Sequence, residues 1–412
     1  MATRSTPAAA PGAPSYLGPF IIVTGLFCIF GFLTNLNSNL SAKLEDIFHL
    51  SHAWSNLITT SWFFAYLVFS VPSGKLIELV GYKRTMVISL FIMVAGALLF
   101  IPAASYAKFP LFLTASFVLA AGVCALQTAA NPYVSILGPE HSAPARLTLA
   151  QAFNSLGTAM APIVVGTFIL TNVSKDASEA TVAHTVQGPY VAIAVALLVL
   201  GFIVMFLHLP AIVSSSDSSA EATSGRSIWS YKHTVLGMVG IFFYVGLEVS
   251  LFANAIKFFE TQGIDNKSTV ALLASFYPLS MMIGRFAGTF VMKVIKAERL
   301  LVILGIFGVA LLIVGMVSTG LVAVWCLILC GLANSIMYPT IFALGIAELG
   351  PLTSKGSGVI TLGNFGGGVI PPLFGLMADK TNYQHAFLLP IVGYLFIVFY
   401  GLSGYKPNRK AA

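Results

Sequence analysis

The sequence predicts an all-α membrane protein with twelve transmembrane helices, arranged as two pseudo-symmetric bundles of six. The first observation is composition: 57% of the 412 residues are hydrophobic and 8% are charged, whereas about 25% of the residues of a soluble domain are charged. The second is that apolar residues gather in runs near the roughly 20 residues that a spanning helix needs. The third is a polar stretch that divides these runs into two equal sets. The alternating pattern of barrel strands is absent from the sequence.

The expected helices follow one another with short loops between them. The first run is longer than the roughly 7–15 residues of a signal-peptide core and has no small-residue cleavage site, so we expect it to remain as a helix. A Pro/Ala-rich tail precedes it. The twelve helices are expected near 17–40, 54–80, 84–105, 109–138, 147–171, 189–212, 232–260, 269–293, 299–318, 320–346, 355–378 and 384–405.

A polar stretch, SSSDSSAEATSGRS at 214–227, has the composition of a flexible linker and follows the sixth helix. It divides the chain into two domains of six helices each. The expected organisation is a cytoplasmic tail at 1–16, an N-terminal bundle at 17–212, a cytoplasmic linker at 213–231, a C-terminal bundle at 232–405 and a cytoplasmic tail at 406–412.

The two halves repeat short motifs at matching places. PYVSILG at 132–138 matches PTIFALG at 339–345. Two parallel six-helix repeats with a site between them are a transporter architecture. The other matched positions are Asn154, Ser155, Gly157, Pro162 and Gly166 with Gly363, Asn364, Gly366, Pro371 and Gly375, and Gly25 and Gly31 with Gly240 and Gly246.

The distribution of charge predicts the topology. Most Lys and Arg fall in loops on the side of the N-terminus, which places both termini in the cytoplasm. We therefore interpret the net charge of +7 as a membrane topology signal and expect no nucleic-acid partner. The four cysteines are scattered through apolar runs as small core residues. No cluster of catalytic residues lies at the helix ends, so we expect no enzyme activity, no metal site and no cofactor beyond a coupling ion.

Polar side chains inside the expected helices indicate a water-accessible binding site between the helices. Unpartnered polar groups cost several kcal/mol in hydrocarbon, so they tend to face a bundle interior or cavity. Most of these residues carry neutral amides, which donate and accept hydrogen bonds as sugar hydroxyls do. The alternative is that they join neighbouring helices, at about 0.6–2 kcal/mol per contact. The candidate substrate-binding residues are Asn35, Ser38, Gln127, Asn131, Gln151, Asn154 and Asn364.

One acid, Glu248, lies near the middle of an expected helix. An ionised acid there costs about 2.5–3.5 kcal/mol or more, so a function is favoured. It is our candidate for ion coupling, as a proton carrier or a cation ligand; a structural carboxyl hydrogen-bonded to a neighbouring helix is the alternative. Arg285 is also inside a helix, and we expect it to snorkel or to form a structural pair.

The loop after the second helix resembles motif A of the major facilitator superfamily. The motif is a glycine, an acid, a second glycine and a basic pair, which in that family hold the inner gate through charge contacts. The matching residues are Gly74, Glu78, Gly81, Lys83 and Arg84.

A longer resemblance covers essentially the whole chain. QTAANPYVSILGPE at 127–140 and RLTLAQAFNSLG at 146–157 look like the fucose, glucose and galactose transporters of the major facilitator superfamily, and YVGLEV at 244–249 and YPTIF at 338–342 extend the match. The resemblance implies a central sugar site, alternating access and a monomer in the inner cell membrane. The fucose symporters have an aspartate where Ser38 stands and a glutamate where Gln127 stands, both implicated there in proton coupling. Glu248, where the glucose/galactose relatives also have an acid, is then the remaining candidate for coupling.

The sequence therefore predicts a secondary active transporter that imports a neutral hexose with H⁺ or Na⁺. Alternatives within the fold are an uncoupled sugar uniporter and a carrier of another polar neutral solute. A remote alternative is a sugar sensor that does not transport. The expected partners are a small-molecule sugar and the lipid bilayer.

Overall fold

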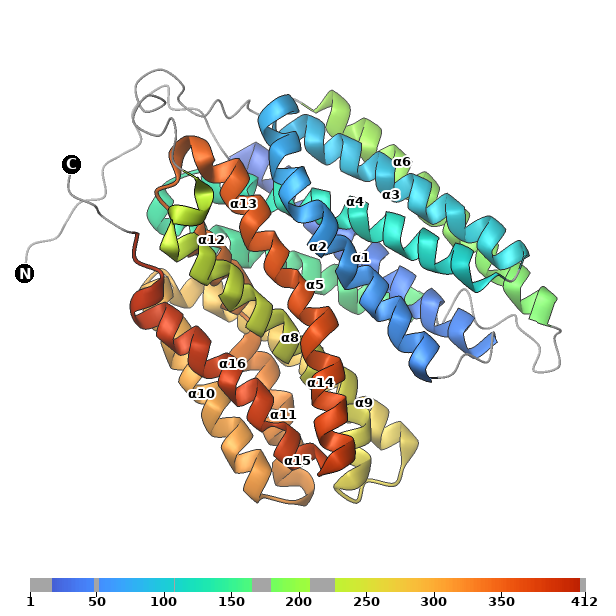
Figure 1. The fold of residues 1–412 in the computed structure, drawn as a ribbon, viewed down its shortest axis with the longest axis vertical. Coiled ribbons are helices and arrows are strands. Elements are labelled where there is room, and N and C mark those ends of the chain that lie inside the picture. Colours follow the sequence, from blue (N-terminus) through green and yellow to red (C-terminus); the bar gives the residue numbers. More distant parts are fainter. Residues whose placement is uncertain (1–16, 48–51, 107, 165–178, 208–226, 408–412) are drawn as a thin grey trace, which may run out of the picture.

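The computed structural model describes residues 17–47, 52–106, 108–164, 179–207 and 227–407, with the backbone alone described at 36–47, 52–59, 162–164 and 179–186. In these ranges the chain forms helices joined by short turns, and no strand occurs. The helices are grouped as two bundles, one from each half of the chain (Figure 1). The predicted all-α architecture is confirmed.

Within the described residues, the N-terminal bundle contains six long helices. The turn η1 (Glu140–Ser142) joins the fourth helix to the fifth. The six are α1 (Leu17–Ile47), α2 (His52–Val80), α3 (Tyr82–Ser105), α4 (Phe109–Ile136), α5 (Ala143–Val164) and α6 (Glu179–Phe206).

The C-terminal bundle is more often interrupted. It starts with η3 (Ile228–Ser230), within the expected linker, and ends with a π-helical turn, η6 (Tyr400–Gly404). Between them lie α8 (Lys232–Thr261), α9 (Lys267–Val291), α10 (Ala297–Val317), α11 (Gly320–Asn334), α12 (Met337–Gly345), η4 (Gly350–Leu352), α13 (Thr353–Leu362), η5 (Gly363–Phe365), α14 (Gly366–Lys380), α15 (Tyr383–Ala386) and α16 (Leu388–Phe399).

Eleven spans within the described ranges are long and apolar enough to cross a membrane. They include α11 with α12 as one span and η4 through α14 as another. The expected helix at 147–171 is the one without a span in this set; α5 begins earlier, at Ala143, and its expected end lies outside the described residues. The expected helix at 320–346 is broken at Ser335–Ile336, which leaves backbone carbonyls available to side chains.

The internal repeat has a counterpart in packing. A Cβ on Gly157 of α5 would meet the Cys28 carbonyl of α1, and a Cβ on Gly366 would meet the Phe242 carbonyl of α8. Both glycines therefore let a helix approach the first helix of its own bundle at backbone contact. The matched glycines therefore allow the same close helix contact in each half.

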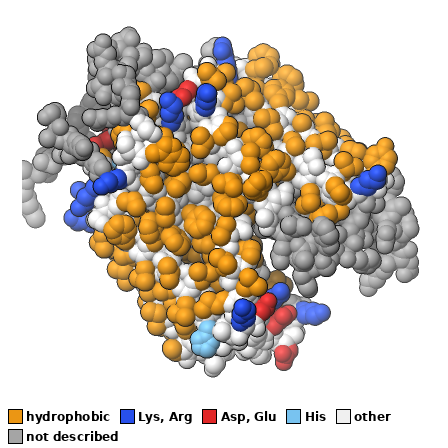
Figure 2. Space-filling model, viewed as in Figure 1, with side chains coloured by type: hydrophobic (Ala, Val, Ile, Leu, Met, Phe, Trp, Pro, Cys, Tyr) orange, Lys and Arg blue, Asp and Glu red, His pale blue; other side chains and the backbone are white. Residues whose placement is uncertain are grey.

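The outer surface suits a hydrocarbon environment. Large apolar side chains such as Phe202, Ile303 and Leu395 are exposed. Figure 2 shows hydrophobic side chains over the middle of one face, with Lys, Arg, Asp and Glu toward its margins. Exposed apolar residues on this scale indicate contact with lipid, so the protein is a multi-pass membrane protein.

Candidate transport site and gate

The two bundles meet along a narrow set of helices. The N-terminal bundle contacts the other half through α2, α4 and α5. The C-terminal bundle contacts these helices through α9, α12, α13 and α14. Figure 1 shows α2 beside α13 and α14 at this boundary. We call one end of the molecule the basic end, defined by Lys83, Arg84, Lys296 and Lys355.

A hydrogen-bond network crosses the boundary between the halves. Asn131 Nδ2 of α4 donates to the Tyr338 hydroxyl of α12 at 3.2 Å, and Asn364 Nδ2 of η5 donates to the same oxygen at 3.5 Å. Gln151 Nε2 of α5 donates to Asn131 Oδ1 at 3.5 Å. All four side chains are buried. Asn131 and Tyr338 hold matched positions in the repeat, so the network lies where the two halves face each other.

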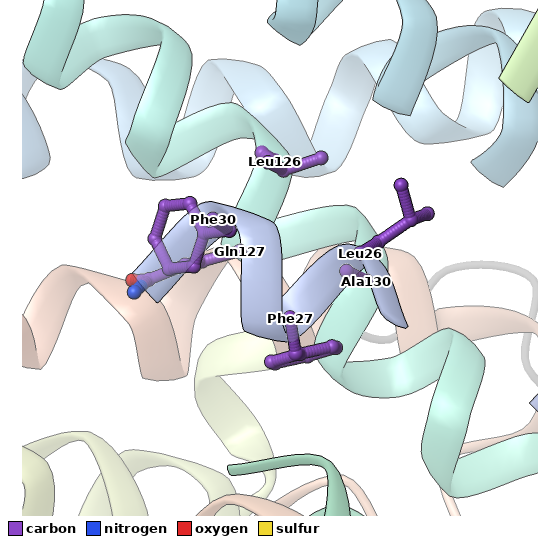
Figure 3. Close-up of a pocket in the computed structure, with 6 residues that line it drawn as sticks. All are labelled: Leu26, Phe27, Phe30, Leu126, Gln127 and Ala130. Atoms are coloured by element: carbon purple, nitrogen blue, oxygen red, sulfur yellow. The ribbon is translucent and has the colours of Figure 1, made fainter. Parts of the chain in front are cut away.

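Gln127 lies one turn before Asn131 on α4. Its Oε1 accepts a hydrogen bond from the Tyr66 hydroxyl of α2 at 3.1 Å. Gln127 also lines a small hollow of about 10 Å³ between α1 and α4, whose other walls are apolar. Figure 3 shows Phe30 and Gln127 at one end of it and Leu26 and Ala130 at the other. An amide beside an aromatic ring offers the two contacts that a sugar uses, a hydrogen bond and an apolar face.

Two other candidates join α1 to α5. Asn35 Nδ2 donates to the Thr158 carbonyl at 3.1 Å, and Asn154 Nδ2 donates to the Phe27 carbonyl at 3.0 Å. In this conformer both amides therefore serve the helix contact that the sequence left open as an alternative. Ser38 is in α1, at a position where the structure describes the backbone alone.

Glu248 lies midway along α8 and is half-buried. Tyr244 lies one turn earlier on the same helix, and the neighbouring helix α9 carries Arg285. The Tyr244 ring packs 6.1 Å from that of Tyr338, measured between centroids. The acid is therefore close to the network that crosses the boundary.

Arg285 does not snorkel, contrary to one of our two expectations, because it is buried with a relative exposure of 7%. Its Nε donates to the Ser335 carbonyl at 3.2 Å, at the break between α11 and α12. Its Nη1 donates to the Gln151 carbonyl at 3.2 Å and to the Ser155 hydroxyl, both on α5 of the other half. The guanidinium thus bridges the bundles.

The residues of motif A lie where α2 and α13 close the basic end. A Cβ on Gly74 would be 2.8 Å from the Ser354 carbonyl oxygen and 3.2 Å from Gly358 Cα, so the two helices touch through their backbones. Glu78 Oε1 forms an ion pair with Lys355 Nζ at 3.3 Å.

The rest of the motif turns the chain from α2 into α3. Gly81 has φ of 84°, a conformation that favours glycine. Lys83 is half-buried and Arg84 is exposed at the start of α3. Beside these residues, Ser357 donates to the Thr128 carbonyl of α4 at 2.6 Å. The basic end is therefore closed by backbone packing, with the ion pair at its rim.

The sequence profile of the Major Facilitator Superfamily matches residues 22–370. The chain belongs to this superfamily. It is 41% identical over 387 residues to a glucose/galactose transporter of Brucella abortus, covering 93% of each chain. It is 32% identical over 410 residues to the L-fucose–proton symporter of Escherichia coli, covering 94% of this chain and 93% of the symporter.

Solved structures of the superfamily agree with the fold. The crystal structure of the transporter FucP in its outward conformation matches with a TM-score of 0.86 and 30% identity, covering 95% of this chain and 99% of FucP. The proton:xylose symporter XylE bound to 6-bromo-6-deoxy-D-glucose matches with a TM-score of 0.80 at 12% identity, which supports the fold alone. The closed basic end of this superfamily member is thus one conformer of a two-bundle transporter.

The structure brings some candidates together and separates others. Asn131, Gln151 and Asn364 share one network, and Gln127 lies one turn away; Asn35 and Asn154 are at the α1–α5 contact. Sequence reasoning gave no role at the boundary to Arg285 or to Lys355. The signal for Arg285 was the same as for Glu248, a charge inside a spanning helix. The sequence contained no signal for a role of Lys355, because a lysine at the basic end is expected from membrane topology alone.

Proposed function

We propose that the protein imports a neutral hexose of the glucose/galactose type by alternating access, coupled to H⁺. The observation that carries the proposal is the buried network of Asn131, Gln151, Tyr338 and Asn364, which draws on both halves. Its donors and acceptors are neutral, as sugar hydroxyls are. The printed activities of the relatives, glucose/galactose transport and fucose–proton symport, support the same substrate class.

The network gives a physical reason for coupling sugar binding to movement. In this conformer its amides form hydrogen bonds with one another and with the Tyr338 hydroxyl, so the network links the two halves. Hexose hydroxyls that take over these hydrogen bonds replace contacts between halves by contacts to the sugar, at little net cost because bonds are exchanged rather than lost. The halves are then free to rock about the site.

Glu248 is the proposed proton carrier, because it is an acid midway along a spanning helix, one turn from Tyr244, whose ring packs 6.1 Å from that of Tyr338 in the network. We place the basic end in the cytoplasm by the positive-inside rule, which puts the protein in the inner cell membrane with both termini inside. One chain supplies both halves of the site, so we propose that the monomer is the transporting unit.

The proposal is tested by counterflow of labelled sugars in proteoliposomes. We expect D-glucose, D-galactose or L-fucose to exchange, and the charged analogue glucose 6-phosphate to be excluded. Uptake of the phosphate ester in place of the neutral sugars would refute the substrate class. If sugar accumulates under a sodium gradient but not under a proton gradient, the proposed substrate class stands and the coupling ion is Na⁺ instead of H⁺.

A matched pair of variants tests the site. Asn131→Ala removes an amide of the boundary network, and Asn334→Ala removes a buried amide that bonds Tyr277 and Tyr394 within the C-terminal bundle. Losing one or two hydrogen bonds costs about 1–2 kcal/mol, so we expect Asn131→Ala to raise the KM about tenfold. Asn334→Ala should lower thermal stability and leave the KM unchanged. Equal KM values for both would remove Asn131 from the site.

A further inference from the structure

Phe63 of α2 packs directly on the backbone of the other bundle. A Cβ on Gly367 of α14 would lie 2.4 Å from two ring atoms of Phe63, Cε1 and Cζ. A Cβ on Gly368 would lie 3.0 Å from the Phe63 Cβ. The two glycines therefore leave the room that this aromatic side chain occupies, at the place where Figure 1 shows α2 beside α14.

The contact borders the hydrogen-bond network in both bundles. On α2, Tyr66 lies one turn after Phe63, with 6.4 Å between the ring centroids, and its hydroxyl donates to Gln127 Oε1. In the C-terminal bundle, Asn364 of the network lies one turn before Gly367. In each bundle, the next turn thus carries a residue of the candidate site or its hydrogen-bond partner.

The ring lies on the side of the network that faces away from the basic end. α2 ends at the basic end, and Gly74 contacts α13 there. Phe63 precedes Gly74 by about three turns, roughly 16 Å along the helix. α14 continues α13 away from the basic end, so Asn364 lies between Gly358, which meets Gly74, and Gly367, which meets Phe63. The network therefore has a contact of α2 on each side of it.

The two contacts close the site in different ways. Toward the basic end, Gly74 meets backbone atoms of α13, so that passage opens only when the helices move apart. On the other side, the group that meets the α14 backbone is a side chain. The Phe63 ring is half-buried, and a helix permits an aromatic side chain two χ1 rotamers. The ring can therefore swing off the glycines while both helices, and the closed basic end, stay in place.

We propose that Phe63 is a specificity-determining residue, a side-chain gate between the hydrogen-bond network and the membrane face opposite the basic end. When the ring turns away, it leaves a space of the size of one six-membered ring beside the turn that carries Asn364. A pyranose is also a six-membered ring, so a monosaccharide passes and a glycoside with a second ring is held back. The inference deepens the proposed hexose transport and rests on it.

The test measures how strongly benzyl glucoside inhibits the counterflow of labelled D-glucose in proteoliposomes. This probe carries the sugar that the network would bind and a phenyl group like that of Phe63. Wild type should resist it, because the two phenyl groups compete for one place. In Phe63→Ala the benzyl group fills the vacated space, and burial of an aromatic ring changes affinity by about a factor of ten or more. We expect the inhibition constant to fall about tenfold in Phe63→Ala.

Two variants of α2 and one further sugar are the matched controls. Phe64→Ala removes the neighbouring ring, which is exposed and stacks on Phe117 of its own bundle, so its inhibition constant should equal that of wild type. Phe63→Tyr keeps the ring and should resist the inhibitor as wild type does. Methyl glucoside, which has no second ring, should inhibit all four proteins equally. Equal inhibition constants for benzyl glucoside in wild type and Phe63→Ala would overturn the gate.

A double variant tests the contact on which the gate depends. Gly367→Ala forces the ring off α14 and should lower the midpoint of thermal unfolding. In Phe63→Ala with Gly367→Ala, the added methyl group enters the space that the ring has left, so the loss should be smaller than the sum of the two single losses. Gly375→Ala on the same helix is the control, because a Cβ there meets nothing within 4 Å. Additive losses would contradict the contact and with it the gate.

The outcomes separate the gate from the function on which it rests. Wild type that exchanges none of D-glucose, D-galactose and L-fucose contradicts the proposed sugar transport itself. Wild type that exchanges these sugars, with the same inhibition constant as Phe63→Ala, overturns the gate alone. Phe63→Leu keeps an apolar side chain without the flat ring and replaces Phe63→Ala if that variant does not fold. Its inhibition constant should also fall, and a value equal to that of wild type would overturn the gate.

Discussion

Gly74→Ala should prevent the basic end from closing fully. The added Cβ would lie 2.8 Å from the Ser354 carbonyl oxygen and 3.2 Å from Gly358 Cα. Carbon atoms attract one another best at about 3.5–4.0 Å, so both contacts are repulsive. Both neighbours are backbone atoms, which cannot rotate away as a side chain would. α2 and α13 must therefore move apart by several tenths of an ångström.

The size of the effect follows from this contact. Overpacking a close contact costs about 1–3 kcal/mol, and here the cost falls only on the state in which α2 touches α13. Because 1.4 kcal/mol is a factor of ten in an equilibrium constant, the population with an open basic end should rise at least about fivefold, and up to about 150-fold. The transporter would then spend less time ready to bind sugar from the opposite side.

The assay uses Ser357, which is fully buried at the closed end, as a reporter. In a Ser357→Cys background, a water-soluble maleimide reacts only when the basic end opens. We expect Gly74→Ala to raise the alkylation rate about tenfold. Gly25→Ala is the matched control, because a Cβ on Gly25 meets nothing within 4 Å. Equal rates in Gly74→Ala and Gly25→Ala would refute closure by backbone packing.

Three further predictions concern the gate, the network and the repeat. Glu78→Gln removes the ion pair with a partly exposed Lys355, which is worth about 0–1 kcal/mol. The alkylation rate of the Ser357→Cys reporter should therefore rise less than about fivefold. A larger rise than the one caused by Gly74→Ala would contradict the conclusion that backbone packing closes the basic end more strongly than the ion pair does. Tyr338→Phe removes the acceptor shared by two buried amides at a cost of about 1–3 kcal/mol; the counterflow KM should rise about tenfold, and an unchanged KM would count against the network. Gly157→Ala and Gly366→Ala should each lower the midpoint of thermal unfolding in detergent, because each forces apart a helix pair in its own bundle; a loss confined to one of them would contradict the structural repeat.

The sequence predicted the helices and the repeat because both depend on local information. A run of apolar residues defines a span, and matched motifs such as those around Gly157 and Gly366 define equivalent helices. The break at Ser335–Ile336 was not predicted, because no proline or glycine occupies those two positions. A tertiary contact occurs at the break, where Arg285 donates to the Ser335 carbonyl.

The candidate site was predicted less completely, for a geometric reason. Helical periodicity tells which side chains share a face, but not which neighbouring helix that face meets. Asn131 and Asn154 looked alike in sequence, and the structure directs one to Tyr338 across the boundary and the other to a carbonyl of α1. Arg285 and Lys355 become informative only when the second bundle is placed against the first.

Uptake of labelled glucose by proteoliposomes under an inward proton gradient, in wild type and in Glu248→Gln, tests the proposed mechanism most directly. With one proton per sugar, a gradient of about one pH unit supports about tenfold accumulation. We expect wild type to accumulate glucose toward that limit and Glu248→Gln only to equilibrate it. Wild type that equilibrates glucose with or without the gradient, or Glu248→Gln that accumulates it as wild type does, would contradict proton coupling at Glu248.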